Sequence, residues 1–150
     1  MKRNATAVWQ GTIKDGQGAL STTSGVLADT PYSFKTRFEN ENGTNPEELI
    51  AAAHAGCFSM ALSVELEKSG FMPQSIHTRA TLTLDRVDSQ WSITDVLLEV
   101  TAEVDRIDEA GFREIAEGAK AGCPVSRLLR ANIKLDAKLD QSRTIERSSA

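Results

Sequence analysis

The chain has 150 residues and a mass of 16.3 kDa, which is the size of one ordinary domain. Hydrophobic residues make up 40% and aromatic residues 5%, so it can bury a core but lacks the aromatic platforms of single-strand nucleic-acid binders. The formal net charge of -4, from 17 basic and 21 acidic residues, argues against nucleic-acid or anionic-membrane partners.

Three strands are predicted before the first helix. Residues 6–13 and 19–23 are β-prone and flank the glycine-containing stretch 15–18, which predicts a hairpin. From Tyr32 to Phe38, aromatic and other less polar side chains alternate with polar ones. This period of two predicts a third strand, with Arg37 on its less apolar face.

A long helix is predicted from Asn45 onward. Asn45 can cap it, Pro46 takes the first helical position and two glutamates follow in the first turn. The helix is expected to run to Lys68 and stop at Gly70. Its middle is apolar almost all round, so we place it in the centre of the fold. A membrane span is the rival interpretation, but the apolar run is shorter than roughly 18 residues and ends in charged residues.

A second hairpin is predicted after this helix. Residues 76–84 alternate between apolar and polar, a turn follows at 88–90, and residues 91–104 return as a long strand. The return strand changes phase between Ile93 and Val96, which predicts a bulge there.

The last elements are a helix, a short helical turn and a strand. Asp108 can cap a helix over residues 109–122, and Cys123-Pro124 restarts a helical turn that reaches Leu129. Residues 133–139 alternate again and predict a final strand, after which 141–150 are expected to form a flexible polar tail. The element order lacks a steady strand-helix alternation, so we predict an α+β fold in a single domain over residues 1–140.

The cysteine content is two, Cys57 and Cys123, which excludes a disulfide-rich secreted scaffold. The opening residues Met1-Lys2-Arg3-Asn4 lack the basic and apolar run of a signal peptide, so we expect a cytoplasmic protein. Thiols stay reduced there, and two cysteines are either unrelated buried side chains or a redox couple.

The local chemistry of the two cysteines differs. Cys57 lies within the apolar helix, where desolvation raises the thiol pKa, so it needs a nearby cation to become a nucleophile. Cys123 directly precedes Pro124, and the positive end of the following helical turn favours its thiolate. The two lie 66 positions apart with no CxxC motif, so only the fold can bring them together.

His54 lies three residues before Cys57 and therefore shares its helix face. The two side chains could bind a metal if Cys123 or Glu47 supplied further ligands, or they could form a Cys-His nucleophilic pair. The remaining alternative is a histidine that faces a polar partner or the surface.

Two long motifs in this chain resemble those of a known family. Residues 44–62, TNPEELIAAAHAGCFSMAL, resemble the first cysteine motif of the OsmC/Ohr family, which comprises osmotically inducible proteins and organic hydroperoxide resistance proteins. Residues 119–126, AKAGCPVS, resemble the second motif. The stretches 24–27 and 34–38 are more similar to the OsmC branch than to Ohr, and the resemblance covers roughly residues 6–139.

The resemblance implies a thiol-dependent peroxidase of oxidative and osmotic stress defence, which reduces organic hydroperoxides and hydrogen peroxide to alcohols or water. It implies Cys57 as the peroxidatic cysteine, Cys123 as the resolving cysteine, Arg37 as the cation beside the thiolate, and Glu47 as the carboxylate that positions Arg37. Glu47 is chosen over Glu48 by its ten-residue offset from Cys57. The expected partner is a dithiol reductant, with no cofactor, metal or nucleic acid.

The family fold implies antiparallel sheets wrapped around central helices in an intertwined homodimer, with active sites at the subunit interface. The apolar wall around Cys57, with Phe58 and Met60 nearby, would suit the tail of an organic hydroperoxide. A thiol redox sensor or an apolar-ligand-binding dimer without turnover is the alternative function.

The spacing of Glu47 and Cys57 poses a geometric problem. Ten residues of straight helix separate them by about 15 Å along the axis and about 80° around it. Either the helix is broken, or the Glu47 or Arg37 that serves a given Cys57 comes from the other subunit.

Overall fold

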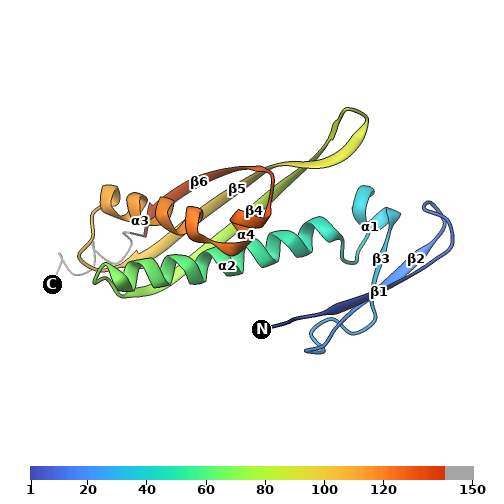
Figure 1. Ribbon diagram of the computed structural model, residues 1–150, viewed down its shortest axis with the longest axis horizontal. Coiled ribbons are helices and arrows are strands. Elements are labelled where there is room, and N and C mark those ends of the chain that lie inside the picture. Colours follow the sequence, from blue (N-terminus) through green and yellow to red (C-terminus); the bar gives the residue numbers. More distant parts are fainter. Residues whose placement is uncertain (141–150) are drawn as a thin grey trace. The chain divides into compact units, whose positions relative to one another are not determined.

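The computed structural model describes residues 1–140 (Figure 1), and the predicted tail at 141–150 lies outside the described residues. The chain forms two compact units, residues 1–50 and the residues from Ala51 onward, and each is described by itself. The elements in chain order are β1 (Ala5–Gln10), β2 (Gln17–Thr22), β3 (Thr30–Ser33), α1 (Phe34–Phe38), α2 (Pro46–Lys68), β4 (Pro73–Val87), β5 (Gln90–Val104), α3 (Glu109–Gly122), α4 (Pro124–Leu128) and β6 (Asn132–Leu139).

The first unit is built on a three-stranded antiparallel sheet in the order β1-β2-β3. β1 pairs with β2 from Ala5↔Thr22 to Gln10↔Gln17, which confirms the predicted first hairpin. The rings of Trp9 and Tyr32 lie 5.5 Å apart and join the outer strands across the sheet.

The strand predicted over Tyr32–Phe38 is wrong in its second half, because Phe34–Phe38 forms the short helix α1. Ser33 Oγ accepts from the Thr36 backbone N–H at 3.2 Å, and Thr36 Oγ1 accepts from the Ser33 N–H at 2.9 Å. These two reciprocal hydrogen bonds stabilise a helix start at Phe34, although the alternating pattern of the sequence favours a strand there. The rings of Phe34 and Phe38 then stack one turn apart, with centroids 4.8 Å apart, so Arg37 lies on a helix and not on a strand.

The start and end of α2 agree with the prediction. Asn45 Oδ1 accepts from the Glu48 backbone N–H at 2.8 Å, which satisfies one of the free N–H groups of the first turn. Gly70, with φ of +84°, ends the helix in a conformation that favours glycine. α2 runs without interruption from Pro46 to Lys68.

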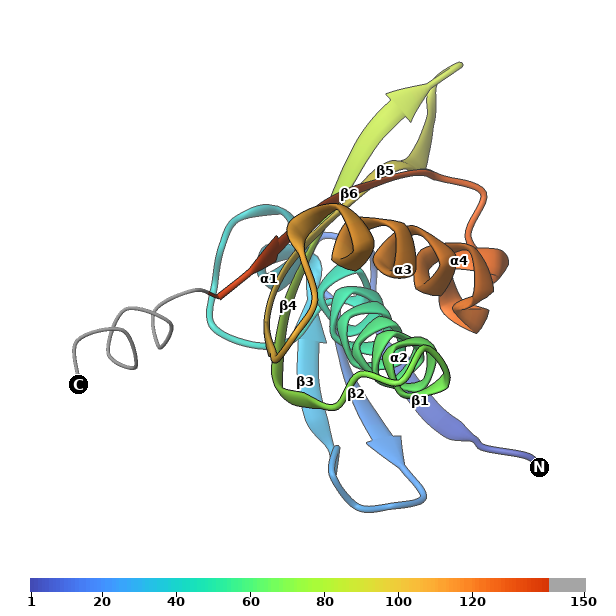
Figure 2. The ribbon, with the colours of Figure 1, turned by 90° about the vertical axis from the view of Figure 1, so that its left-hand side faces the viewer.

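The second unit places α2 and α3 on one face of the sheet β4-β5-β6 (Figure 2). Alternate residues of β5 supply the centre of the core, and Phe58, Leu62 and Leu66 of α2 pack against them with Phe112 of α3. The buried residues of β5 are Val96, Leu98, Val100 and Ala102. The predicted apolar alternation therefore corresponds to the buried face of this sheet.

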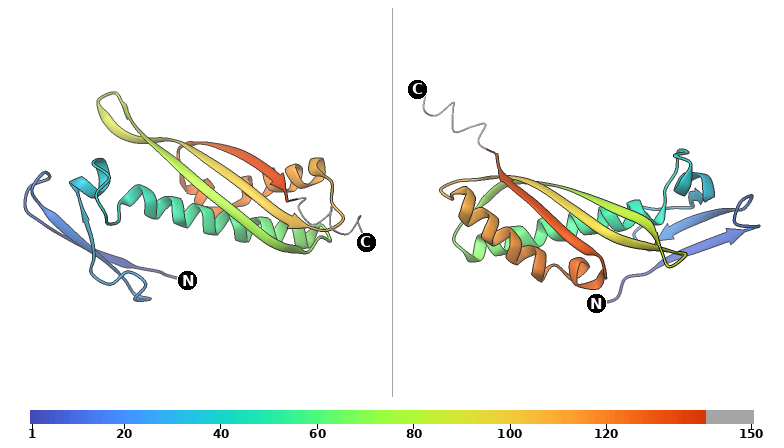
Figure 3. Two further views of the ribbon diagram at one scale, coloured as in Figure 1. Left: turned by 180° about the vertical axis from the view of Figure 1, so that it is seen from behind. Right: turned by 90° about the horizontal axis from the view of Figure 1, so that it is seen from above.

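The hairpin of β4 and β5 confirms the predicted bulge. Thr83 pairs with Asp95 and Leu84 pairs with Ile93, so Thr94 is the extra residue on β5. The hairpin extends past β6 as a two-stranded ribbon (Figure 3), since β6 pairs only with residues 95–102 of β5.

β6 joins the sheet parallel to β5, so the expectation of antiparallel sheets is wrong for this strand. The connection between them contains α3 and α4, and a parallel pairing requires a crossover of this length. Asp108 Oδ1 accepts from the Gly111 N–H at 2.8 Å and caps α3 as predicted.

By length and composition alone, α2 meets the criteria for a membrane span. An 18-residue window of it has a mean hydropathy of 1.5, so the expectation that the apolar run is too short is not confirmed. A core helix of a water-soluble fold meets the same criteria. The face of α2 with His54, Phe58, Leu62 and Leu66 is buried within the chain.

Candidate active site

The fold brings Cys57 and Cys123 together. Cys57 lies in the middle of α2, and Cys123 joins the end of α3 to the start of α4. The two residues approach to 3.4 Å, and both are free thiols. Cys57 is partly exposed, whereas Cys123 has no exposed surface. The tertiary structure therefore supports a redox couple over two unrelated buried side chains.

The two thiols have pKa values shifted in opposite directions. Burial raises the pKa of Cys57, and the neighbouring Cys123 raises it further, although the Val125 backbone N–H opposes the rise. Burial also disfavours the Cys123 thiolate, but hydrogen bonding from the Ser126 backbone, the Cys57 side chain and the Ser126 hydroxyl lowers the Cys123 pKa below its usual value. Cys57 thus needs a cation to ionise, as the sequence predicted, whereas Cys123 is stabilised as a thiolate by its own surroundings.

Arg37 and Glu47 form a close ion pair in the first unit. Arg37 Nε donates to both carboxylate oxygens of Glu47 at 3.1 Å, and Arg37 Nη2 donates to Glu47 Oε1 at 2.6 Å. The Arg37 guanidinium also lies 5.1 Å from the centre of the Phe38 ring. These contacts orient the guanidinium while leaving a third of the Arg37 side chain exposed.

The choice of Glu47 over Glu48 as the partner of Arg37 agrees with the geometry. Glu48 lies beside Asn45, whose Nδ2 donates to Glu48 Oε2 at 3.4 Å. Glu47 also lies ten residues before Cys57 on α2, too far along one straight helix for both to share a site. Since α2 is unbroken, the alternative of a broken helix is wrong.

The hydrogen-bond partner of His54 is Ser126. Its Nε2 lies 2.8 Å from Ser126 Oγ, and the imidazole is completely buried. Burial lowers the His54 pKa, so the ring is neutral at pH 7. The described residues contain no group of three or more His, Cys, Asp or Glu side chains able to hold a metal, and the polar-partner alternative is the one that the geometry supports.

Ser126 is the residue that the sequence analysis did not single out. It lies three residues after Cys123, as His54 lies three residues before Cys57. This three-residue spacing was the signal in the sequence that could have placed Ser126 near Cys123, because residues three apart lie on the same side of a helical turn. The partner of His54 remained undetermined, since it comes from a separate element.

An apolar hollow of about 350 Å³ opens beside Cys57. Met60 and Val64 of α2 line it together with residues of α3 and the start of α4; the complete lining is Cys57, Met60, Ala61, Val64, Glu65, Ala119, Gly122 and Pro124. Met60 therefore lies where the sequence predicted an apolar wall, but Phe58 is wrong for this role because it is buried in the core.

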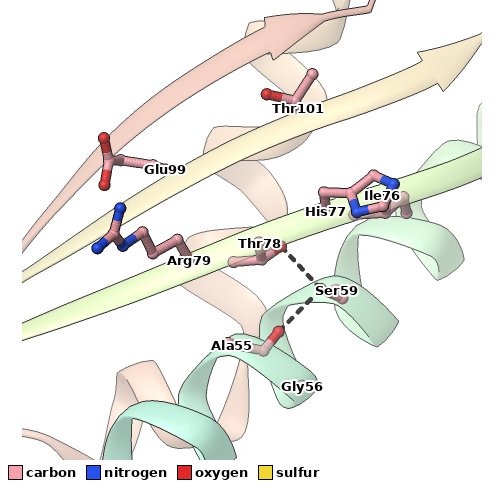
Figure 4. Close-up of a pocket in the computed structure, with 9 residues that line it drawn as sticks. All are labelled: Ala55, Gly56, Ser59, Ile76, His77, Thr78, Arg79, Glu99 and Thr101. Carbon is pink, nitrogen blue, oxygen red and sulfur yellow. Dashed lines mark hydrogen bonds between the residues drawn. The ribbon is translucent and has the colours of Figure 1, made fainter.

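A larger and more polar hollow, of about 570 Å³, lies between α2 and the β4–β5 strands and includes neither cysteine (Figure 4). Ser59 Oγ lies 2.8 Å from Thr78 Oγ1 and 2.9 Å from the Ala55 carbonyl oxygen at its floor. His77 and Arg79 project from exposed positions of β4. A reaction that uses the thiols belongs in the smaller hollow, because Cys57 lines it.

Comparison with known proteins identifies related sequences. Residues 39–138 match the family model described as OsmC-like protein. Peroxiredoxin OsmC of Escherichia coli K12 is 56% identical over 133 residues, covering 89% of this chain and 93% of that protein. Organic hydroperoxide resistance protein OhrB of Bacillus subtilis is 32% identical over 124 residues, covering 82% and 88%.

Solved structures show the same fold. The crystal structure of Bacillus subtilis OhrB superposes with a TM-score of 0.66 at 27% identity, covering 91% of this chain and 98% of that one. An OsmC-like protein of unknown function from Vibrio cholerae superposes with a TM-score of 0.72 at 13% identity, covering 91% and 99%. The α+β prediction is therefore confirmed.

Proposed function

Since this chain belongs to the OsmC-like protein family and is a thiol-dependent hydroperoxide reductase, we propose that Cys57 and Cys123 carry out its reaction. The observation that carries this proposal is the approach of the two free thiols to 3.4 Å, with Cys57 lining an apolar hollow. A disulfide between them needs only a small displacement, because bonded sulfur atoms lie about 2 Å apart.

The first step takes place at Cys57, the cysteine that lines the hollow. Its thiolate attacks the O–O bond of the hydroperoxide, which leaves a sulfenic acid on Cys57 and releases an alkoxide, or hydroxide from hydrogen peroxide. The released anion takes a proton from solvent and becomes the alcohol or water. Met60, Val64 and Ala61 provide apolar surface for the organic tail.

The second step protects Cys57 from further oxidation. Cys123 attacks the sulfenic sulfur and forms the Cys57–Cys123 disulfide, and an external dithiol then reduces it. The completely buried position of Cys123 supports this role, because a thiol without exposed surface is poorly placed to meet a hydroperoxide itself.

Arg37 supplies the cation that Cys57 needs. Its guanidinium is charged at any working pH, and Glu47 fixes its orientation through the forked contact. Since α2 is unbroken between Glu47 and Cys57, we assign Arg37 and Glu47 of one subunit to the Cys57 of the other. The active protein is then a homodimer with two sites at the subunit interface.

Exposed apolar side chains on α2 support a homodimer. Met60 is 74% and Val64 47% exposed, although both belong to a helix whose opposite face is buried in the core. Apolar surface of this kind is typical of interfaces. We also assign the protein to the cytoplasm, where a resting pair of free thiols stays reduced.

Titration of free thiols tests the couple directly. One equivalent of cumene hydroperoxide should remove both thiols of the reduced protein, because Cys123 lies within reach of oxidised Cys57. Counting thiols with a chromogenic disulfide reagent under denaturing conditions measures this result. Loss of only one thiol per chain would contradict the disulfide step.

Mixing two inactive variants tests the shared active site. In a dimer of Cys57→Ser and Arg37→Ala chains, the intact Cys57 of one chain meets the intact Arg37 of the other. Random exchange of equal amounts should restore about one quarter of wild-type activity, since half of the dimers are mixed and each has one intact site. Each variant mixed with itself is the control. No recovery despite subunit exchange shown by native mass spectrometry would place Arg37 and Cys57 of one chain in the same site.

A further inference from the structure

A hydrogen-bonded histidine links the two cysteine-bearing elements of the second unit. His54 lies on α2 one turn before Cys57, and Ser126 lies on α4 three residues after Cys123 (Figure 1). Their side chains meet at 2.8 Å between Nε2 and Oγ, with 0% and 9% of their surfaces exposed. The reaction described above uses neither residue, although they flank both of its thiols.

The environment of His54 Nδ1 indicates which group donates the hydrogen bond between His54 and Ser126. Among the described residues, His54 Nδ1 is the buried side-chain nitrogen or oxygen without a hydrogen-bond partner. A buried N–H without an acceptor costs more than a buried lone pair without a donor. The proton of the neutral ring therefore belongs on Nε2, which donates to Ser126 Oγ. The Ser126 hydroxyl proton is then free to donate elsewhere.

Cys123 is the acceptor that this hydroxyl can serve. Cys123 is the N-cap residue of α4 and Ser126 is its third helical residue, two positions whose side chains lie at the same helix end. In agreement with this placement, the Ser126 side chain is one of the groups that lower the Cys123 pKa, together with the Cys57 side chain. Ionisation of Cys57 before its oxidation removes its S–H donor, and the O–H of the resulting sulfenic acid belongs to the group that departs in the resolving step. Of the Cys57 and Ser126 side chains, only the Ser126 hydroxyl then remains as a donor to the Cys123 sulfur when Cys123 attacks.

We propose that His54 and Ser126 are positioning residues of the resolving step, in which His54 Nε2–H orients the Ser126 hydroxyl so that it donates to the attacking sulfur of Cys123. This inference rests on the proposed roles of Cys57 and Cys123. In the step itself, the Cys123 thiolate forms an S–S bond with the Cys57 sulfur as the S–O bond breaks. Cys123 is oxidised, Cys57 is reduced, and the departing hydroxide takes a proton from solvent to become water.

Within one chain, the two basic side chains nearest to Cys123 in sequence are engaged elsewhere or exposed. Lys120 of α3 is paired with Glu117 at 2.7 Å, and Arg127 of α4 is exposed. The strand residues that share the core with Cys123 are apolar. Within the chain, the side chain that can stabilise the Cys123 thiolate during attack is therefore the uncharged Ser126 hydroxyl.

Rapid-quench oxidation of the full-length protein separates the two steps. Reduced protein is mixed with cumene hydroperoxide, trapped with N-ethylmaleimide at successive times and analysed by mass spectrometry. In Ser126→Ala, Cys57 should be lost at the wild-type rate, whereas loss of Cys123 should slow by about tenfold, the effect of one hydrogen bond to a charged group. Excess peroxide should then convert Cys57 to sulfinic acid, with a mass gain of about 32 Da.

Two further substitutions separate positioning from packing. Ser59→Ala is the matched control, since it removes a partly buried hydroxyl of α2 that hydrogen-bonds to Thr78 and to the Ala55 carbonyl oxygen. It should leave both rates unchanged. His54→Gln retains an N–H donor and should preserve most of the resolving rate, whereas His54→Leu should behave like Ser126→Ala.

The outcomes distinguish this inference from the function on which it rests. If wild type loses both thiols and Ser126→Ala loses them at the same two rates, the relay is wrong while the cysteine couple stands. Equal slowing of both steps in Ser126→Ala and Ser59→Ala would show a purely structural role and also overturn the relay. If wild type loses only Cys57, the disulfide step fails and the relay fails with it.

Discussion

We expect Cys57→Ser to abolish hydroperoxide turnover, with a fall on the order of a thousandfold or more. A serine hydroxyl does not ionise at neutral pH and attacks the O–O bond far more slowly than a thiolate. Consumption of cumene hydroperoxide with a dithiol reductant measures this loss. The fold should persist, because Cys57 lies at the edge of an open hollow and the substitution removes little buried volume.

Cys123→Ser is the matched control for this experiment. It keeps Cys57 and should therefore consume the first equivalent of peroxide at near wild-type speed, after which Cys57 becomes over-oxidised. Turnover by Cys57→Ser would remove Cys57 from the first step. A wild type that stops after one equivalent with every dithiol tried would instead favour a redox sensor.

Arg37→Ala should lower the rate of Cys57 oxidation by about a hundredfold, the effect of removing one charged donor from an active site. Burial raises the Cys57 pKa, and a nearby guanidinium lowers it again because a cation favours the thiolate. Without Arg37, the pH at which Cys57 becomes reactive should therefore rise. Alkylation of Cys57 against pH, measured in a Cys123→Ser background, checks the direction of this change.

Two substitutions show whether the effect depends on the guanidinium. Arg37→Lys keeps the charge but loses the fork that binds both oxygens of Glu47, so its activity should lie between wild type and Arg37→Ala. Arg113→Ala breaks a surface ion pair with Glu109 at 3.3 Å and should leave the rate unchanged. An unchanged pH profile in Arg37→Ala would exclude Arg37 from ionising Cys57.

Most elements were predictable because their signals are local. Asn45 and Asp108 cap their helices through contacts that span three residues, and Gly70 ends α2 with a single backbone angle. The phase change on β5 likewise marked the bulge at Thr94. Each signal acts within one turn or one strand pair, so the sequence alone displays it.

The strand prediction over Tyr32–Phe38 failed because two local signals competed there. Tyr32, Phe34, Thr36 and Phe38 alternate as a strand would, but the reciprocal bonds of Ser33 and Thr36 start a helix instead. A capping serine and threonine three residues apart were present in the sequence. The alternating aromatic pattern outweighed them in the interpretation, although Phe34 and Phe38 also match the spacing of one helical turn.

The sequence by itself determined most of the element types, the intrinsic chemistry of each thiol and the expectation that Cys57 needs a cation. Only the tertiary structure decided that Cys57 and Cys123 approach to 3.4 Å, that β6 lies parallel to β5, and that His54 pairs with Ser126. Caps and periodicities act over a few residues, whereas these contacts join segments tens of residues apart. Such contacts form because the chain buries a common apolar core, and they cannot be predicted from any short stretch of the sequence.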